Sequence, residues 1–377
     1  MSRTEPATLR RVATVEANRL RLPARLAGAG TGSPRGGDVR ERIVVRLSDT
    51  AGRDGWGEIP IQDEVPDHIW NSLVTDYAPR LLTHTWTRPT DAQHAWTDLP
   101  WAPTVQAGLD TACWVLWSRQ HATPLAHSLG GNRTAIPAGA TLGIQPDPEL
   151  MVRAANRQVG RGIRRLRVEV APGHDLEPIR ALRESYPHLA LQVACGGRYQ
   201  ESAEDLRTLH GLDSLELVAI EQPFAATDLA AHARLQRELR TPLALGRDVD
   251  SLATLDAAIA ARAVRALQLH PARLGGLTQA RRAHDRAVDA GWQVWCGADG
   301  MAGPGLAAQT ALASLPGITL PSDIPLPTER RGRWLVDPPI RSHHGLVPVP
   351  LTEAGLGHTV NEAVLREHTV TSTVLHG

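Results

Sequence analysis

Short, largely apolar segments recur along residues 136–323 at a nearly constant spacing, with amphipathic helical segments between them. Eight such segments are present, and the ends of six are 25, 27, 25, 24 and 27 residues apart: Glu169, Ala194, Glu221, Gly246, His270 and Gly297. Segments that are apolar on both faces are typical of parallel strands buried between helices. So regular a period favours a closed (β/α) barrel over an open doubly wound sheet.

The flanking regions lack this period. Leu9–Leu22 and Arg42–Leu47 are strand-like, Trp101–Ala122 carries a helical apolar stripe, and Gly28–Gly37 is a turn-rich loop. The Pro-rich tail has no further βα unit, so we expect it to pack on the N-terminal region. The predicted organisation is an α+β domain, a barrel and a C-terminal segment, at residues 1–130, 131–325 and 326–377.

Composition excludes several classes of function. Forty acidic side chains balance forty basic ones, all of which are arginine, so the chain lacks the basic excess of nucleic-acid and anionic-membrane binders. Without lysine there is no Schiff base, pyridoxal-phosphate anchor or lysine acid/base. No apolar run approaches a membrane span, the N-terminus has no secretory h-region, and three scattered cysteines suggest a reducing compartment. We therefore expect a cytoplasmic protein.

Charged residues gather where the barrel strands end, which is where active sites of such barrels lie. Side chains alternate along a strand, so Arg165, Arg167 and Glu169 point to one side, and Gln192 and Gln268 also point inwards. The residues expected at this end of the barrel are Arg167, Glu169, Glu221, Arg247, Asp248, His270 and Asp299, with Trp295 and Cys195 near the rim.

Several motifs occur in one order along the chain: Gly55–Glu58 (GWGE), Pro124–Gly131 (PLAHSLGG), Ile220–Pro223 (IEQP), Leu274–Thr278 (LGGLT) and Ser314–Ile324 (SLPGITLPSDI). Together they resemble the enolase superfamily, nearest its N-acylamino-acid racemase and o-succinylbenzoate synthase branch, which is muconate lactonizing enzyme-like. The resemblance implies a (β/α)7β TIM-like barrel, of class α/β, under an α+β capping domain built from both ends of the chain. It also implies a homo-oligomer, a dimer or an octamer.

The resemblance further implies proton abstraction next to a carboxylate, with the enediolate stabilised on Mg²⁺. It places the three metal ligands on Ala194, Glu221 and Gly246, and the catalytic lysines on Arg167, Glu169 and His270. One carboxylate of three is too few for Mg²⁺, which demands near-octahedral oxygen coordination. We therefore expect no metal and no other cofactor.

Arginine offers a replacement for the dication, since a guanidinium stays charged and fits a carboxylate. In one hypothesis Arg167 and Arg247 hold a substrate anion, His270 is the base and Glu169 the acid. In the other, the ion pairs Arg247–Glu221 and Arg167–Glu169 are structural, and His270 only hydrogen-bonds a neighbouring glutamate. Further candidates for substrate contact are Glu221, Asp248, Asp299 and Trp295.

The sequence thus predicts a metal-independent enzyme that moves protons on a small carboxylate, by isomerisation, epimerisation, elimination or cyclisation. A non-catalytic, ligand-binding barrel is one alternative. An ordinary Mg²⁺-dependent o-succinylbenzoate synthase or racemase is the other, and it requires the strand registration above to be wrong.

Overall fold

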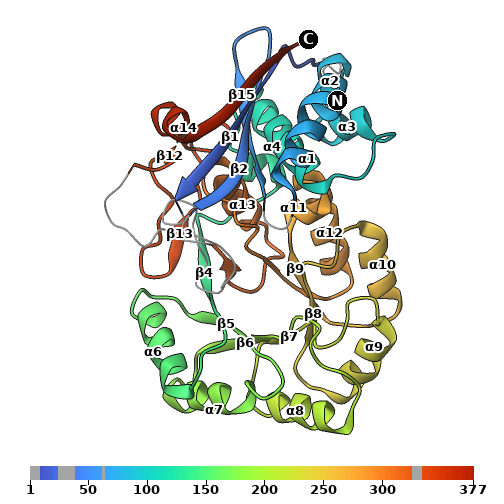
Figure 1. Ribbon diagram of the computed structural model, residues 1–377, viewed down its shortest axis with the longest axis vertical. Helices are drawn as coiled ribbons and strands as arrows, with labels where there is room; N and C mark the ends of the chain where they lie inside the picture. Colours follow the sequence, from blue (N-terminus) through green and yellow to red (C-terminus); the bar gives the residue numbers. More distant parts are fainter. Residues whose placement is uncertain (1–8, 24–38, 62–63, 325–332) are drawn as a thin grey trace, which may run out of the picture.

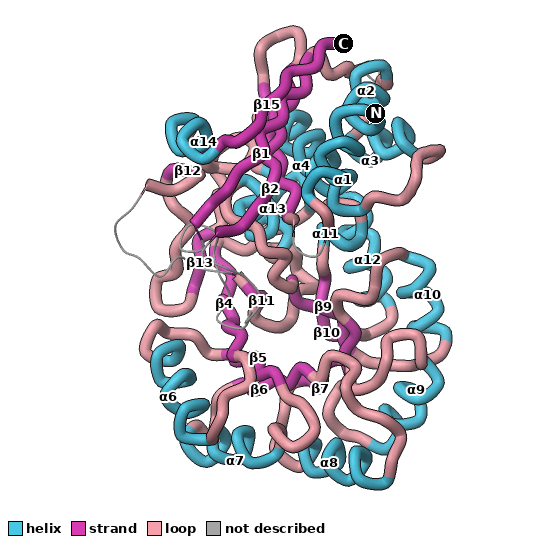
Figure 2. Tube along the Cα trace, in the orientation of Figure 1, coloured by secondary structure: helices cyan, strands magenta, loops and turns pink. Residues whose placement is uncertain are grey.

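The computed structural model describes residues 9–23, 39–61, 64–324 and 333–377. Its centre is a parallel sheet with strand order β10-β9-β8-β7-β6-β5-β4-β11, and helices form an outer arc around it (Figures 1 and 2). The strands are β4 (Ala135–Leu142), β5 (Arg165–Glu169), β6 (Ala190–Ala194), β7 (Ala219–Glu221), β8 (Leu243–Leu245), β9 (Ala266–Leu269), β10 (Gln293–Cys296) and β11 (Ser322–Asp323). The predicted fold class is confirmed.

The helices of the barrel follow its strands in alternation: α6 (Pro148–Val159), α7 (Leu176–Ser185), α8 (Ala203–Asp213), α9 (Leu229–Glu238), α10 (Leu252–Ala260), α11 (Pro271–Leu274), α12 (Leu277–Asp289) and α13 (Pro304–Leu312). Most of the longer ones begin at a residue whose side chain accepts a backbone N–H of the first turn, such as Asp147 before α6 and Ser202 before α8. Such local caps begin these helices where the chain leaves a strand of the sheet.

Side chains help to close the barrel between β10 and β11, where the strands are short. The Cys296 amide donates to Ser322 Oγ at 3.1 Å. Gln309 Nε2, from α13, donates to the carbonyl of Gly297 at 2.6 Å and to that of Asp323 at 3.2 Å. These contacts fix the end of the two-residue strand β11 and hence the direction of its Asp323 side chain.

A second, antiparallel sheet of order β15-β1-β2-β3 caps the barrel (Figure 1). Its strands are β1 (Thr14–Pro23), β2 (Val39–Ser48), β3 (Asp54–Pro60) and β15 (Thr369–His376), so chain segments from before and after the barrel share one sheet. The helical elements beside it are α1 (Pro66–Asn71), η1 (Ser72–Tyr77), α2 (Ala78–Thr83), α3 (Pro89–Ala92), η2 (Gln93–Trp96), α4 (Pro103–Gln120) and α5 (Leu125–Leu129).

The C-terminal segment serves both sheets. Its strand β13 (Leu346–Pro348) pairs antiparallel with β4 of the barrel, while β15 pairs with β1. Its remaining elements are β12 (Val336–Asp337), β14 (Thr359–Val360) and α14 (Glu362–His368). The predicted loop Gly28–Gly37 lies outside the described residues. Among the described helices, none is long and apolar enough to cross a membrane.

Two carboxylates of the capping region cap barrel helices that begin at glycine. Asp110 of α4 accepts the amide of Thr278 at 2.9 Å and its hydroxyl at 2.6 Å, at the start of α12. The N-cap residue of α12 is Gly276, at φ +123°, where a side chain would collide with Asp110. Glu58 likewise accepts the amides of Gly303 and Gly305 at the start of α13. The capping region is thereby fastened to the barrel by helix caps.

Asp110 should make folding pH-dependent, because burial raises the pKa of this carboxyl to about 7, although hydrogen bonds from Thr278 oppose the shift. A folded-state pKa above the unfolded one stabilises the fold at low pH, and this stability is lost as the pH rises towards 7. Between pH 5 and 7 the free energy of unfolding should fall as the pH rises, by up to about 1.4 kcal/mol per pH unit from this group. We expect Asp110→Asn to remove this contribution. Urea unfolding at several pH values measures this pH dependence. The exposed Asp98, in an Asp98→Asn control, should leave the slope unchanged.

Candidate active site

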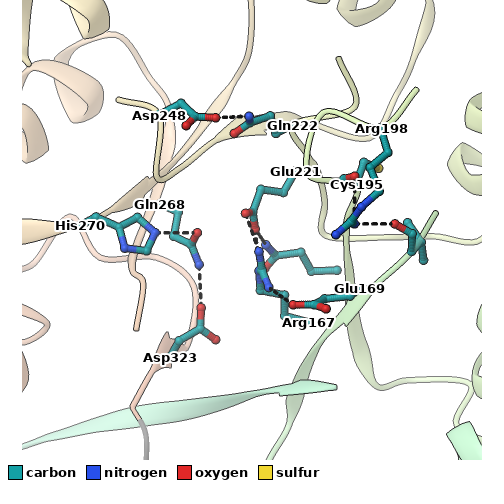
Figure 3. A network of polar contacts seen from close by, with 12 residues as sticks. Arg167, Glu169, Cys195, Arg198, Glu221, Gln222, Asp248, Gln268, His270 and Asp323 are labelled. Carbon is teal, nitrogen blue, oxygen red and sulfur yellow. Dashed lines mark hydrogen bonds and ion pairs between the residues drawn. The ribbon is translucent and has the colours of Figure 1, made fainter. Parts of the chain in front are cut away.

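An ion pair occupies the carboxyl ends of β5 and β7. Arg167 donates from Nε to Glu221 Oε2 at 2.7 Å and from Nη2 to Glu221 Oε1 at 2.6 Å (Figure 3). Gln192 of β6, between them, donates from Nε2 to Glu221 Oε2 at 2.9 Å. Burial acts to lower the pKa of Arg167, but its contacts with the Glu221 carboxylate raise that pKa overall. Both carboxylate oxygens of Glu221 are thus already bonded to donors, one of them a permanent cation.

Glu169, at the end of β5, is the more exposed carboxylate beside this pair. Its Oε1 lies 3.9 Å from Arg167 Nη1, the guanidinium nitrogen that does not bond to Glu221, and 28% of its side chain is exposed. Burial raises the pKa of Glu169 above its ordinary value, and the attraction of Arg167 only partly offsets this. A carboxyl with a raised pKa next to an anion-holding nitrogen is suited to act as a general acid.

A second chain of contacts crosses the barrel interior to His270. Arg165 of β5 is fully buried, and its Nη2 lies 2.5 Å from Asp323 Oδ1. Gln268 Nε2 donates to Asp323 Oδ2 at 2.7 Å, and Gln268 Oε1 lies 2.9 Å from His270 Nε2 (Figure 3). His270 Nδ1 lies 2.6 Å from Asp299 Oδ1. Because Gln192 Oε1 accepts from Arg165 Nη1 at 2.6 Å, one network joins Glu169 to Asp299.

The position of Asp299 depends on the capping region. Its loop follows β10, and Arg42 Nη1 of β2 donates to the carbonyl of Gly300 at 2.9 Å and to Glu58 Oε1 at 2.6 Å. Glu58, in the GWGE motif of β3, also accepts the amide of Ala302 at 2.8 Å. Asp299 Oδ2 itself accepts the amide of Ala272 at 3.0 Å. A buried ion pair of the capping sheet therefore holds the loop that carries the partner of His270.

The other predicted residues are either exposed or packed in the interior. Asp248 is exposed and accepts from Gln222 Nε2 (Figure 3). Arg247 is also exposed. Trp295 is fully buried in a cluster with alanines of β7, β8 and β9, with the Arg165 guanidinium 5.9 Å from its ring. Cys195 is buried, and burial raises the pKa of its thiol. Trp295 and Cys195 thus lie in the packed interior.

Asp323 is the residue of the network that the sequence did not single out, although it lies in the LPSDI end of the last motif. A strand of two residues gives too little alternation to show which side chain points inwards. The pairing of Gln192 and Gln268 with charged partners was also not predicted, although their inward direction was. An inward glutamine on an apolar strand signals a buried polar partner, because a buried amide must be hydrogen-bonded.

Comparison with known proteins bears on this architecture. Residues 150–364 match the family described as enolase C-terminal domain-like. The chain is 31% identical to an o-succinylbenzoate synthase of Geobacillus kaustophilus over 344 residues, which is 90% of this chain and 91% of that protein. The chain belongs to the enolase superfamily. Other superfamily relatives agree: an N-succinylamino acid racemase of Thermus thermophilus is 36% identical over 274 residues, covering 73% of this chain and 74% of that protein.

Solved structures of the superfamily agree with the fold over nearly the whole chain. A member from Listeria innocua superposes with a TM-score of 0.90 at 25% identity, covering 97% of this chain and 99% of that one. The superfamily's (β/α) barrel and capping region are therefore both present.

The residues at the three superfamily ligand positions do not fit Mg²⁺. Ala194 and Gly246 have no side-chain oxygen, and the Glu221 carboxylate is bonded to Arg167 and Gln192. A Cβ atom at Gly246 would lie 2.8 Å from Gln268 Oε1 and 3.4 Å from Glu221 Oε1, so these two groups occupy the space next to it. Within the described residues, no group of three or more His, Cys, Asp or Glu could hold a metal ion.

Proposed function

We propose that this superfamily member catalyses acid/base proton transfer on a small carboxylate without a metal ion. The bidentate contact of Arg167 with Glu221 carries the proposal, because it puts a permanent cation where the resemblance places a dication. Arg167 Nη1 faces Glu169 and offers the remaining guanidinium edge to a substrate anion. Proton transfer here covers isomerisation, epimerisation, elimination or cyclisation.

The proposed roles follow from charge and position. Arg167 holds the carboxylate and stabilises the negative charge that develops when a neighbouring C–H loses its proton. Glu169, with its raised pKa, supplies a proton, and the His270–Asp299 pair takes one up. A guanidinium stabilises an enolate less strongly than a dication, so we expect a substrate with a more acidic C–H or a good leaving group.

The names of these two relatives suggest the first substrates to test. Each names a compound in which a succinyl group is attached to a second carboxylate-bearing unit. Chelator-treated protein is incubated with a panel of N-succinylamino acids in D2O, and exchange of the α-proton is followed by NMR. We expect exchange that is unchanged by the chelator. Exchange that appears only after Mg²⁺ is added would contradict the proposal and favour ordinary superfamily chemistry.

Metal binding can be tested by melting temperature, without measuring turnover. We expect millimolar Mg²⁺ or Mn²⁺ to leave the melting temperature of chelator-treated protein unchanged, because Glu221 is already neutralised by Arg167. A ligand that binds only the folded state raises the melting temperature in proportion to its affinity. A clear rise, with about one metal per chain by elemental analysis, would contradict a metal-free site.

One observation favours a second candidate, a ligand-binding barrel without catalysis. Both oxygens of Glu221 and both ring nitrogens of His270 are engaged within the protein, so these two side chains are satisfied without a substrate. Stabilisation by a succinylated carboxylate without any proton exchange would support this candidate.

A further inference from the structure

The contacts around Arg165 determine which nitrogen of His270 carries a proton. An arginine side chain cannot be deprotonated in a protein, and Arg165 is fully buried with Nη2 2.5 Å from Asp323 Oδ1. The buried guanidinium requires a compensating charge, so Asp323 is ionised and both of its oxygens only accept hydrogen bonds.

This charge fixes the orientation of the Gln268 amide. Its terminal group lies 2.7 Å from Asp323 Oδ2, and only the amino end of an amide can donate to a carboxylate. The amide oxygen must therefore face His270, where it lies 2.9 Å from Nε2. An amide oxygen accepts and cannot donate, so the Nε2 atom of His270 must carry the proton of this hydrogen bond.

We propose that His270 Nε2 is permanently protonated, and that the exchangeable proton of this pair lies between His270 Nδ1 and Asp299 Oδ1, 2.6 Å apart. In the usual His–carboxylate arrangement the carboxylate accepts from Nδ1 and leaves the Nε2 lone pair as the base. Here Gln268 removes that lone pair. Gln268 and Asp323 are thus positioning residues that direct proton exchange to Nδ1 and Asp299.

The surroundings of the ring contain no other described acceptor for Nε2. A side chain at Gly297 of the β10 end would overlap the ring, so backbone packs against it there. Charged groups near His270 and Gln268 include Asp299 after β10, Asp323 of β11 with Arg165 of β5, and Glu221 of β7 near Gln268. Glu221 is paired with Arg167. The inference deepens the proposed function by naming the nitrogen that exchanges protons, but the protonation pattern itself needs no turnover.

The test is NMR of the full chain labelled with ¹⁵N-histidine, in which His270→Gln identifies the signals of this residue. We expect Nε2 to be protonated at every pH at which the wild-type chain is folded. In Gln268→Leu we expect this proton to be lost near neutral pH, with Nδ1 donating to Asp299 in the usual arrangement. Gln192→Leu is the matched control: it removes an equally buried amide of the same network that does not touch His270. It should leave the His270 signals unchanged.

An unprotonated Nε2 in the folded wild-type chain would overturn the proposal, as would an unchanged His270 pattern in Gln268→Leu. If Gln268→Leu does not fold, the wild-type titration alone decides. Because none of these signals depends on a substrate, a protein that fails to turn over any carboxylate can still confirm or overturn the inference. Conversely, turnover without the expected protonation pattern would support the proposed function but would exclude proton exchange through Nδ1.

Discussion

A Glu169→Gln variant is expected to lose at least about 100-fold in turnover, in line with the usual contribution of a general acid. The amide keeps the size of the side chain and removes the proton that the carboxyl supplies next to Arg167. Since the raised pKa keeps Glu169 protonated to higher pH than an ordinary glutamate, wild-type turnover should fall as the pH rises through that pKa. Steady-state rates on the substrate found by proton exchange, measured across pH, give both results.

Glu201→Gln is the matched control, because Glu201 also faces an arginine, Arg234, but on the exposed surface of the barrel. It should leave the rate unchanged. His270→Ala is expected to match the loss of Glu169→Gln, as the other end of the network. Wild-type rates in both His270→Ala and Glu169→Gln would show that these residues take no part in the chemistry.

An Arg165→Met variant is expected to lower the free energy of unfolding by about 3–5 kcal/mol, because it leaves the Asp323 carboxylate buried without its cation. The side chains of this pair are 0% and 5% exposed, so water cannot compensate. The effect is measured by urea unfolding followed by circular dichroism.

A second substitution separates the unpaired charge from lost packing. Arg165→Met with Asp323→Asn should be more stable than Arg165→Met alone, since the double variant has no buried carboxylate to desolvate. Arg286→Met removes a similar contact with Asp256 on the surface and should change stability far less. A double variant no more stable than Arg165→Met would mean that the guanidinium contributes by packing and not by charge.

Much of the barrel could be predicted because its strands are short and buried on both faces. Three predicted strand ends coincide with those of the structure: Glu169, Ala194 and Glu221. Each of the other three predicted ends lies one residue beyond the end of the observed strand. Alternation along a strand then places Arg167 and Gln268 inside the barrel, since successive side chains point to opposite faces. Those inward directions depend only on backbone geometry, which a regular period reveals.

The partners within the site could not be predicted, because they depend on side-chain rotamers and on which strands face each other across the barrel. From the sequence, Glu221 was paired with Arg247, whereas the structure gives the bidentate contact with Glu221 to Arg167, two strands away. His270 was expected near a glutamate, yet its neighbours are Gln268 of β9, two residues before it, and Asp299 on a loop held by the capping sheet.

The capping sheet imposes an order on synthesis and folding. Strand β1 lies between β2, which follows it closely along the chain, and β15, which is separated from it by the whole barrel. A ribosome therefore releases the barrel before the strand that completes the cap, and until then one edge of β1 is open to pairing with other chains. Such distant pairing gives a high contact order, which slows folding. The barrel is formally an insertion within its own cap.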